Sequence, residues 1–249
     1  MFANDSITNN PIIIPIFNKL KEHQHDLADA LPNLIWVNDP TNKSKKIMFL
    51  RDKDYNFSRY NFFLINYLLF NNKTKEAKKV IRNSRKEYNS NLLIKQTENF
   101  FLNNENEKIK NFFNCKNPND PLAEFFYVIA NLYSSEKDYR LSNFYLKISL
   151  FLNSKFTPNE ALFAENFYYQ KKNKESKSIY YSIKSIGPAY SWYASKNIAT
   201  ILLYEKGKEY SLNSLEKDFN LLSNPNFEHY YELANFYKDN EYYKESIKY

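Results

Sequence analysis

Two positions recur through the second half of the chain with one spacing, and this repeat constrains the fold more than any other feature. The first series has small residues amid apolar ones, at Ala130, Ala164, Thr200 and Ala234, with steps of 34, 36 and 34 residues. The second series keeps the same steps, at Ser142, Ser176, Leu212 and Ser246. A period in this range is typical of repeat arrays. The shared phase therefore predicts a repeat array over residues 120–249.

Each repeat contains two amphipathic helical patterns separated by a short polar turn. In the first clear unit, Phe126, Ile129 and Tyr133 recur at helical spacing, and a second stripe follows over residues 139–153 after the turn SSEKD. Two helices of this length cannot bury their apolar faces alone, but stacked neighbours can. The chain has only 2 glycines, which argues against glycine-rich nucleotide-binding loops and tight β-hairpins. An all-α chain is therefore expected.

Proline marks the expected start of each first helix. Proline is tolerated in the first turn of a helix, where its missing N–H has no intrahelical partner. The four expected starts are Asp120-Pro121, Thr157-Pro158, Gly187-Pro188 and Asn224-Pro225. Gly207 falls in the turn of the third unit, where a positive φ is useful.

The pattern resembles the tetratricopeptide repeat (TPR) family. In the first unit the resemblance is carried by Phe126, Ile129, Ala130, Tyr133, Tyr139, Ser142, Leu146 and Ser149. It implies a right-handed α-solenoid of stacked antiparallel helix pairs. The repeats are expected at about 123–156, 157–190, 193–226 and 227–249, with the last incomplete. Residues 55–119 are expected to form degenerate TPR-like repeats with a basic helix at 74–88. Residues 1–54, with no clear repeat, are expected to be irregular or partly helical.

The resemblance also implies a concave groove, lined by the first helix of each pair, that binds a peptide. Carried over, the groove residues are Tyr127, Asn131, Ser134, Ser135, Glu165, Tyr168, Tyr169, Asn197, Tyr204, Tyr231 and Asn235. Tyrosine supplies amphipathic contact area, and asparagine can hydrogen-bond a peptide backbone in both directions. One TPR subtype holds a carboxylate with lysine and asparagine. Here Tyr127 and Tyr231 stand where that lysine would be, which argues against such a clamp.

The positive charge of the chain is concentrated in its first half. The net charge is +7, yet residues 120–249 hold 16 basic and 16 acidic side chains. A helical stripe within 73–86 carries much of the excess, at Lys75, Lys78, Lys79, Arg82, Arg85 and Lys86. The simplest interpretation is a solvated helix face. The alternative is a patch for an anionic partner such as nucleic acid, another polyanion or anionic lipid.

No catalytic or metal-binding constellation stands out, so no enzyme activity and no cofactor are expected. His23 and His25 lie two residues apart, and helical residues at that spacing do not share a face. A catalytic zinc needs at least three converging ligands. The single cysteine, Cys115, has no fixed histidine partner and is expected to be a packing thiol.

The expected function is a non-catalytic scaffold or adaptor that binds a protein or peptide partner in the groove. The alternatives are polyanion binding through the basic half, or a repeat region whose catalytic domain lies in a longer protein. No signal peptide or membrane span is evident, so the cytoplasm is the default location. The last repeat stops about one turn into its second helix, which predicts a fragment or a fraying end. A truncated N-terminus would leave a periplasmic or exported location open.

Overall fold

The computed structural model describes residues 58–88, 90–114 and 116–249. The chain divides into two compact units, Met1–Tyr55 and Asn56–Tyr249, and the described residues all belong to the second. The predictions for residues 1–54, His23, His25 and Cys115 fall outside the described residues. The helices and contacts of the structure are therefore those of the second unit.

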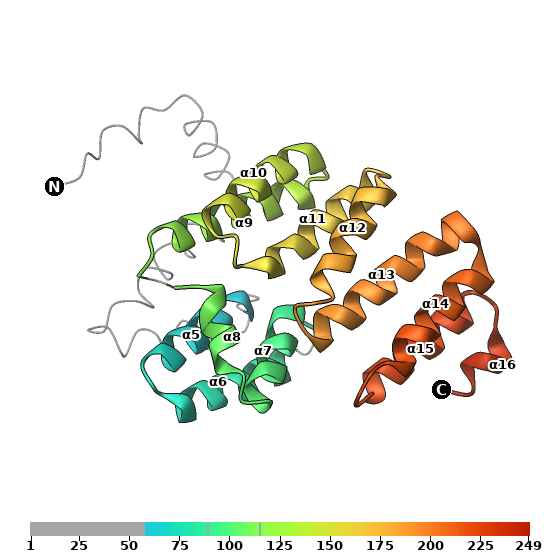
Figure 1. Ribbon diagram of the computed structural model, residues 1–249, viewed down its shortest axis with the longest axis horizontal. Coiled ribbons are helices and arrows are strands. Elements are labelled where there is room, and N and C mark those ends of the chain that lie inside the picture. The colour runs from blue at the N-terminus through green and yellow to red at the C-terminus, as the bar shows by residue number, and fades with distance from the viewer. Residues whose placement is uncertain (1–57, 89, 115) are drawn as a thin grey trace. The chain divides into compact units, whose positions relative to one another are not determined.

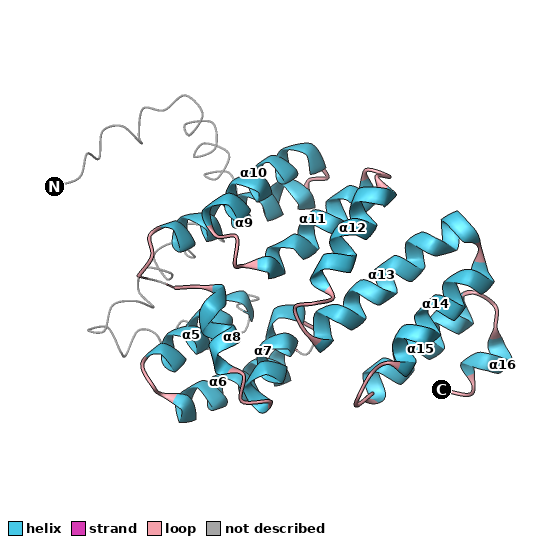
Figure 2. Ribbon diagram, in the orientation of Figure 1, coloured by secondary structure: helices cyan, strands magenta, loops and turns pink. Residues whose placement is uncertain are grey.

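The described residues form helices and no strand, which confirms the all-α prediction for this part of the chain (Figures 1 and 2). Consecutive helices pack in adjacent pairs joined by short turns. The helices are α5 (Ser58–Phe70), α6 (Thr74–Glu87), α7 (Leu92–Leu102), α8 (Asn106–Phe112), α9 (Asn119–Ser135), α10 (Tyr139–Leu152), α11 (Glu160–Tyr169), α12 (Asn173–Ile183), α13 (Pro188–Lys206), α14 (Lys208–Asn220), α15 (Phe227–Asp239) and α16 (Tyr243–Ser246), with a 3-10 turn η1 (Thr157–Asn159) before α11.

One hydrogen bond joins the two helices of each of the last four pairs. A serine hydroxyl on the second helix donates to the carbonyl of an alanine 12 residues earlier on the first. The pairs are Ser142–Ala130 at 2.7 Å, Ser176–Ala164 at 2.9 Å, Ser211–Ala199 at 2.6 Å and Ser246–Ala234 at 2.9 Å. The small alanine lets the helices approach, and the serine hydroxyl, buried in the first three of these pairs and half-buried in the last, has a partner because it meets a carbonyl.

This bond corrects the predicted phase of the third repeat by one residue. The sequence pattern aligned Thr200 and Leu212 with the other repeats, but the bonded pair is Ala199 and Ser211. Thr200 instead donates to the carbonyl of Lys196 within α13. The repeat steps become 34, 35 and 35 residues, and the third repeat keeps the alanine and serine of the others.

The same spacing extends to the first two helix pairs. Ile65 and Ala77 lie 12 residues apart on α5 and α6, and Thr97 and Ile109 lie 12 apart on α7 and α8. The exposed fraction of these four side chains is at most 2%. Residues 58–112 therefore continue the helix-pair pattern with apolar or threonine side chains where the later pairs use alanine and serine.

Five of the six turns within the described pairs have the same backbone geometry. One residue adopts a positive φ, and the next N–H bonds to a carbonyl five residues back, as in a Schellman motif. The positive-φ residues are Asn72, Asn104, Lys137, Lys171 and Glu241. The turn between α13 and α14 differs, because Gly207 has φ 88° and ψ 174°, outside the left-handed helical region of the other five. The predicted positive φ at Gly207 is confirmed.

The helix starts follow the prolines only in part. α13 begins at Pro188 as predicted, and Pro121 lies in the first turn of α9. Pro158 lies in η1, so a 3-10 turn precedes α11. The prediction at Asn224-Pro225 is wrong by two residues, because α15 begins after Asn226, whose side chain accepts a hydrogen bond from the backbone N–H of His229.

Helix α13 lies in the middle of the C-terminal core. One cluster packs it against α11 and α12 through Tyr180, Ile183, Tyr190 and other residues. A second cluster packs its other side against α14 and α15 through Trp192, Ala199 and Leu215, among others. A helix that is buried on several sides is apolar over most of its surface, which fits the sequence of α13.

Helix α7 also packs against α13, although two helix pairs separate them in the sequence (Figure 1). The Gln96 side chain on α7 accepts a 3.0 Å hydrogen bond from the Ala189 N–H at the start of α13, and Lys95 pairs with Glu228 on α15. In a strictly linear solenoid each repeat contacts only its neighbours. This contact departs from the expected solenoid and brings α7 against α13 and α15, the first helices of later pairs.

Among the described residues, no helix combines the length and the apolar character that crossing a membrane would require.

Candidate functional site

The residues expected to line a groove all lie on the first helices of the last four pairs. They are Tyr127, Asn131, Ser134 and Ser135 on α9; Glu165, Tyr168 and Tyr169 on α11; Asn197 and Tyr204 on α13; and Tyr231 and Asn235 on α15. Their environments differ widely. Some are covered or hydrogen-bonded by other parts of the chain, and others are open to solvent.

Tyr127 is covered by another helix of the same chain. The guanidinium carbon of Arg59, on α5, lies 3.7 Å from the centre of the Tyr127 ring and 4.9 Å from that of Phe156. Cation–π contact at this range is favourable, and more so away from water. Burial raises the pKa of the Tyr127 hydroxyl. A peptide cannot reach this tyrosine face while Arg59 occupies it.

Arg59 is held in place by a buried carboxylate. Its Nε and Nη2 donate to the two oxygens of Glu124 on α9, at 2.5 and 2.6 Å, and Nη2 also donates to Asn159 at 2.6 Å. The Glu124 side chain has no exposed surface, and that of Arg59 is 19% exposed. Burial raises the pKa of Glu124, and the charge and hydrogen bonds of Arg59 oppose that rise. The pairing is bidentate, and bidentate arginine–carboxylate pairs are among the strongest ion pairs in proteins.

Glu165 has a tyrosine rather than a cation as its partner. The Tyr193 hydroxyl, on α13, donates to the Glu165 carboxylate, and Tyr180 packs edge-on to Tyr193 at 5.9 Å. Burial raises the pKa of Glu165, and the Tyr193 hydrogen bond opposes the rise. The carboxylate therefore links α11 to α13 rather than standing open for a ligand.

Three further expected groove residues use their polar groups within the fold. Ser134 donates to Asn166 at 2.7 Å, and the Asn166 amide donates to Ser142 and Asn143. Ser135 donates to a carbonyl of its own helix, as does the amide of Asn197. The corrected phase also moves the groove position expected at Asn197 to Lys196, which pairs with Glu232 on α15.

Four tyrosines gather at one edge of α10, α11 and α13, and we name them the tyrosine cluster: Tyr139, Tyr168, Tyr169 and Tyr204. The Tyr139 and Tyr169 rings stack at 5.3 Å, and Tyr168 meets Tyr169 edge-on at 5.6 Å. Burial raises the pKa of Tyr168, and the nearby Tyr204 and Tyr169 add to the rise. Tyr169 is 60% exposed and Tyr204 is 75% exposed. The fold thus brings together aromatic rings from three helices and leaves two of them in solvent.

The remaining expected groove residues have other surroundings. Asn131 is exposed on α9. On α15, Tyr231 stacks with the exposed Phe227 at 6.1 Å, and Asn235 accepts a hydrogen bond from Lys238. The expected residues therefore do not form one continuous open surface.

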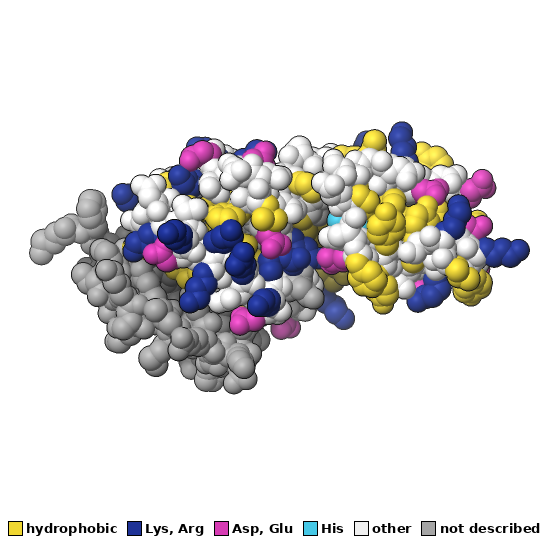
Figure 3. Space-filling model, turned by 90° about the horizontal axis from the view of Figure 1, so that it is seen from below, with side chains coloured by type: hydrophobic (Ala, Val, Ile, Leu, Met, Phe, Trp, Pro, Cys, Tyr) yellow, Lys and Arg dark blue, Asp and Glu magenta, His cyan; other side chains and the backbone are white. Residues whose placement is uncertain are grey.

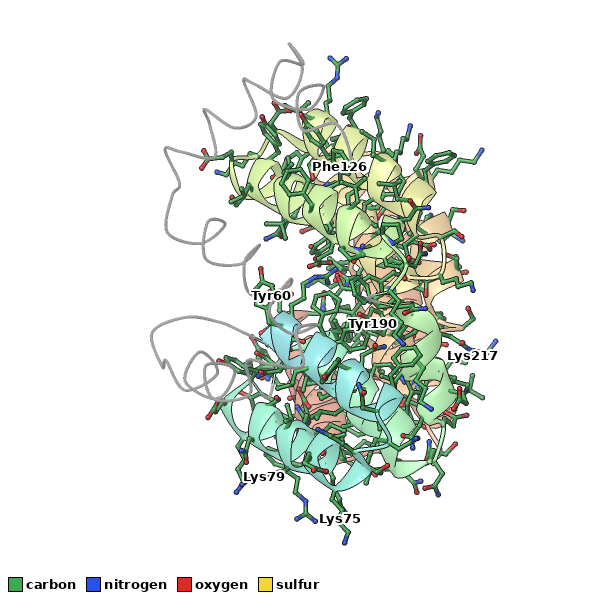
Figure 4. All side chains as sticks on the ribbon, turned by 90° about the vertical axis from the view of Figure 1, so that its left-hand side faces the viewer. Tyr60, Lys75, Lys79, Phe126, Tyr190 and Lys217 are labelled. Carbon is green, nitrogen blue, oxygen red and sulfur yellow. The ribbon has the colours of Figure 1, made fainter. Side chains whose placement is uncertain are left out.

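The six expected anion-binding residues lie on one helix, α6. Lys75, Lys78, Lys79, Arg82 and Lys86 are exposed, and Lys75 and Lys79 point away from the neighbouring helices (Figure 4). Arg85 is half-buried and pairs with Glu98 on α7 at 2.7 Å. An open hollow of about 480 Å³ lies among Arg82, Arg85, Lys86 and Glu98. In Figure 3, lysine and arginine side chains gather on the left half of the described surface, and hydrophobic side chains gather on the right half.

In the described part of the chain, no group of three or more histidine, cysteine or acidic residues could hold a metal ion. The described histidine, His229, has a structural role. Its Nδ1 accepts a 3.0 Å hydrogen bond from the Asn226 N–H at the start of α15, and its ring meets Trp192 edge-on. Burial lowers the pKa of His229.

The sequence did not predict that Arg59, Glu124 and Tyr193 would lie at the expected groove. Arg59 lies 65 residues before Glu124, outside the four clear repeats, so repeat spacing offered no signal for the pair. Tyr193 lies on the first helix of the third pair, but the repeat pattern gave no sign that its hydroxyl would bond to Glu165 of the preceding pair. The cluster member Tyr139 is one of the residues that carry the TPR resemblance rather than an expected groove residue, and the structure stacks its ring on Tyr169.

No model of a known protein family matches the sequence, and no curated protein shows significant similarity to it.

Proposed function

We propose that this protein is a non-catalytic scaffold of TPR-like helix pairs that binds a protein partner through the tyrosine cluster. The observation that carries this proposal is the exposure of Tyr169 and Tyr204 beside ordered tyrosine rings. Side chains at the centre of protein interfaces are enriched in tyrosine, because its ring buries a large area and its hydroxyl can hydrogen-bond.

The tyrosine cluster is already partly ordered before a partner binds. Tyr169 stacks on Tyr139 and touches Tyr168, so its ring loses less conformational freedom on binding than an isolated side chain would. The chain covers the other end of the expected groove itself, since Arg59 lies on Tyr127 and Tyr193 holds Glu165. The partner therefore docks toward the turn ends of α11 and α13.

The scaffold role is favoured over catalysis by what holds the buried acids. Glu124 is neutralised by Arg59, and Glu165 is hydrogen-bonded by Tyr193. Catalytic carboxyl groups need an open reaction site within hydrogen-bond reach, whereas these two link helices of the fold.

The test compares two double variants of the full chain in quantitative affinity purification from cells. Tyr169→Ser with Tyr204→Ser removes the two exposed rings of the cluster. Tyr181→Ser with Tyr210→Ser is the matched control, because these tyrosines lie on the second helices α12 and α14 and are 57% and 51% exposed. We expect a partner retained by wild type and control to be lost from the cluster variant.

Circular dichroism and thermal unfolding of both variants show whether the fold is kept. Loss of the partner with an unchanged unfolding transition supports the proposal. Equal retention by both variants, or equal loss from both, contradicts docking at the tyrosine cluster.

A further inference from the structure

We propose that the outer face of α6 binds the phosphate backbone of a double-stranded nucleic acid without reading its sequence. This surface lies on a different helix pair from the tyrosine cluster, so the inference goes beyond the proposed protein binding and does not depend on it. Its lining residues are Lys75, Lys78, Lys79, Arg82 and Lys86, which we name the basic stripe.

The basic stripe concentrates unpaired cations on one face of a single helix, α6. None of its five side chains forms an ion pair with a described carboxylate. Between later helix pairs, lysines are paired across the packing surface, as in Lys177–Glu205, Lys184–Asp218 and Lys196–Glu232. Those ion pairs stabilise the packing of neighbouring helix pairs. The five like charges of the stripe, within 12 residues, instead repel one another and lower the stability of the protein without a partner.

The fold presents the stripe on a rigid support. On its inner side, α6 buries Ala77, Ile81 and Ser84 against its neighbours, so the outer side is fixed toward solvent. Arg85 is oriented by its pairing with Glu98 at the rim of the hollow. Arg82 and Lys86 line the same hollow, which is large enough to admit a phosphate group between them.

The arrangement of the charges favours a nucleic-acid duplex over other anions. At 1.5 Å per residue, the stripe from Lys75 to Lys86 is about 17 Å long. A duplex carries a negative charge about every 1.7 Å of its axis, so every side chain of the stripe can meet a phosphate. Single strands are commonly bound with aromatic platforms for their bases, and α6 contains no aromatic residue. The stripe is therefore suited to sequence-independent contact with the backbone of a duplex.

A bilayer fits this helix less well. Basic helices that bind membranes insert an apolar face among the lipids. The apolar face of α6 is already buried in the protein core, and its exposed surface also carries Glu76 and Glu87. A membrane contact could therefore be electrostatic only.

The experiment measures binding of the full chain to a fluorescent 20-base-pair DNA duplex, and to the RNA duplex of the same sequence, across a range of salt concentrations. We expect binding of several unrelated sequences with similar affinity, and a negative slope of log affinity against log salt. In the variant Lys75→Gln, Lys78→Gln, Lys79→Gln, Arg82→Gln, each lost phosphate contact should reduce the magnitude of that slope by about 0.9. Affinity at low salt should fall at least about tenfold.

The matched control removes the same number of charges elsewhere. Lys147, Lys171, Lys174 and Lys217 are exposed and pair with no described carboxylate, and replacing them by glutamine lowers the net charge equally. Lys217 lies on α14, well away from Lys75 and Lys79 in Figure 4. This control should keep most of the affinity and of the salt slope.

Several results would overturn the proposal. One is the absence of duplex binding at low salt. Another is an equal loss in both four-site variants, which would mean that net charge alone is responsible. A third is stronger, stripe-dependent binding of phosphatidylserine vesicles, poly-glutamate or single strands than of duplexes, which would identify a different anion. Partner capture by the tyrosine cluster should be unchanged in the stripe variant, so failure of one proposal can be told from failure of the other.

Discussion

Arg59 donates two hydrogen bonds to the fully buried carboxylate of Glu124, 65 residues further along the chain. This pair ties α5 to α9, and the same guanidinium covers Tyr127. The contact closes one end of the surface that TPR-like repeats would offer to a ligand. The chain thus fills part of its own expected groove and leaves the tyrosine cluster open.

Replacing Arg59 by methionine should destabilise the fold strongly. The change keeps apolar contact with Tyr127 and Phe156 but leaves the Glu124 carboxylate buried without a cation. Breaking a buried pair in this way costs about 3–5 kcal/mol. Urea unfolding measures the loss. The double variant Arg59→Met with Glu124→Leu should recover much of it, since the uncompensated charge is gone. A double variant whose losses simply add would show that Arg59 and Glu124 do not act as a pair.

The corrected phase of the third repeat predicts that a large side chain is tolerated at Thr200 but not at the adjacent Ala199. Ala199 is fully buried in the core around α13, α14 and α15, whereas Thr200 is only half-buried. Ala199→Leu should therefore cost about 1–3 kcal/mol through overpacking. Thr200→Leu should change the unfolding free energy much less. Thermal and urea unfolding of the two variants decide the point, and a greater loss at Thr200 would restore the uncorrected alignment.

Gly187 is required because the Gln96 side chain occupies the space of its missing Cβ. A Cβ added there would lie 2.1 Å from the Gln96 Nε2, and Gln96 is fully buried. Gly187→Ala should then destabilise by about 1–3 kcal/mol, since a buried side chain must shift. The comparison is made in a Gln96→Ala background, where the alanine at 187 should cost clearly less. If Gly187→Ala lowered the free energy of unfolding equally in both backgrounds, a clash with Gln96 would not be the reason that glycine is required.

Glu165 should make stability fall as the pH rises above its usual pKa of 4.5. Burial raises the pKa of Glu165 in the folded state, so between 4.5 and that raised value the folded protein binds more protons than the unfolded chain. The free energy of unfolding therefore decreases with rising pH in this window. Glu165→Gln keeps an acceptor for the Tyr193 hydroxyl but carries no charge. The free energy of unfolding of this variant should therefore fall less steeply with pH than that of wild type.

A second variant tests the same linkage in the opposite direction. Tyr193→Phe removes the hydroxyl that stabilises the Glu165 carboxylate, so its stability should fall more steeply between acidic and neutral pH. Urea unfolding at several pH values gives the three slopes. The order Tyr193→Phe, wild type, Glu165→Gln, from steepest to shallowest, is expected, and identical slopes would exclude Glu165 as the titrating group.

The helical content and the paired arrangement could be predicted from sequence because they depend on local periodicity. Ala130 and Ser142 recur with their partners in other repeats, and the hydroxyl bond that explains their spacing is local to one helix pair. The one-residue error at Thr200 and Leu212 arose because small or apolar residues stand beside the true positions. The extra residues lie between pairs rather than in the turn at Gly207, because Ser176 to Ala199 and Ser211 to Ala234 each span 23 residues where Ser142 to Ala164 spans 22.

The contacts of α5 and α7 could not be predicted in this way. Arg59 meets Glu124, and Gln96 meets Ala189, across separations of 65 and 93 residues. No local pattern encodes such a distance, and a nearest-neighbour repeat offers no place for it. For the same reason, the sequence indicated which side chains lie on the first helices but not which of them the chain itself covers.

Site-specific photo-cross-linking tests the central claim, partner binding at the tyrosine cluster, most directly. A photoreactive phenylalanine analogue would replace Tyr169 or Tyr204 in cells, with Tyr181 and Tyr210 as positions of similar exposure on the second helices. The proposed function predicts a discrete cross-linked protein from positions 169 and 204 and none from 181 and 210. Cross-links from 181 or 210 alone would contradict it.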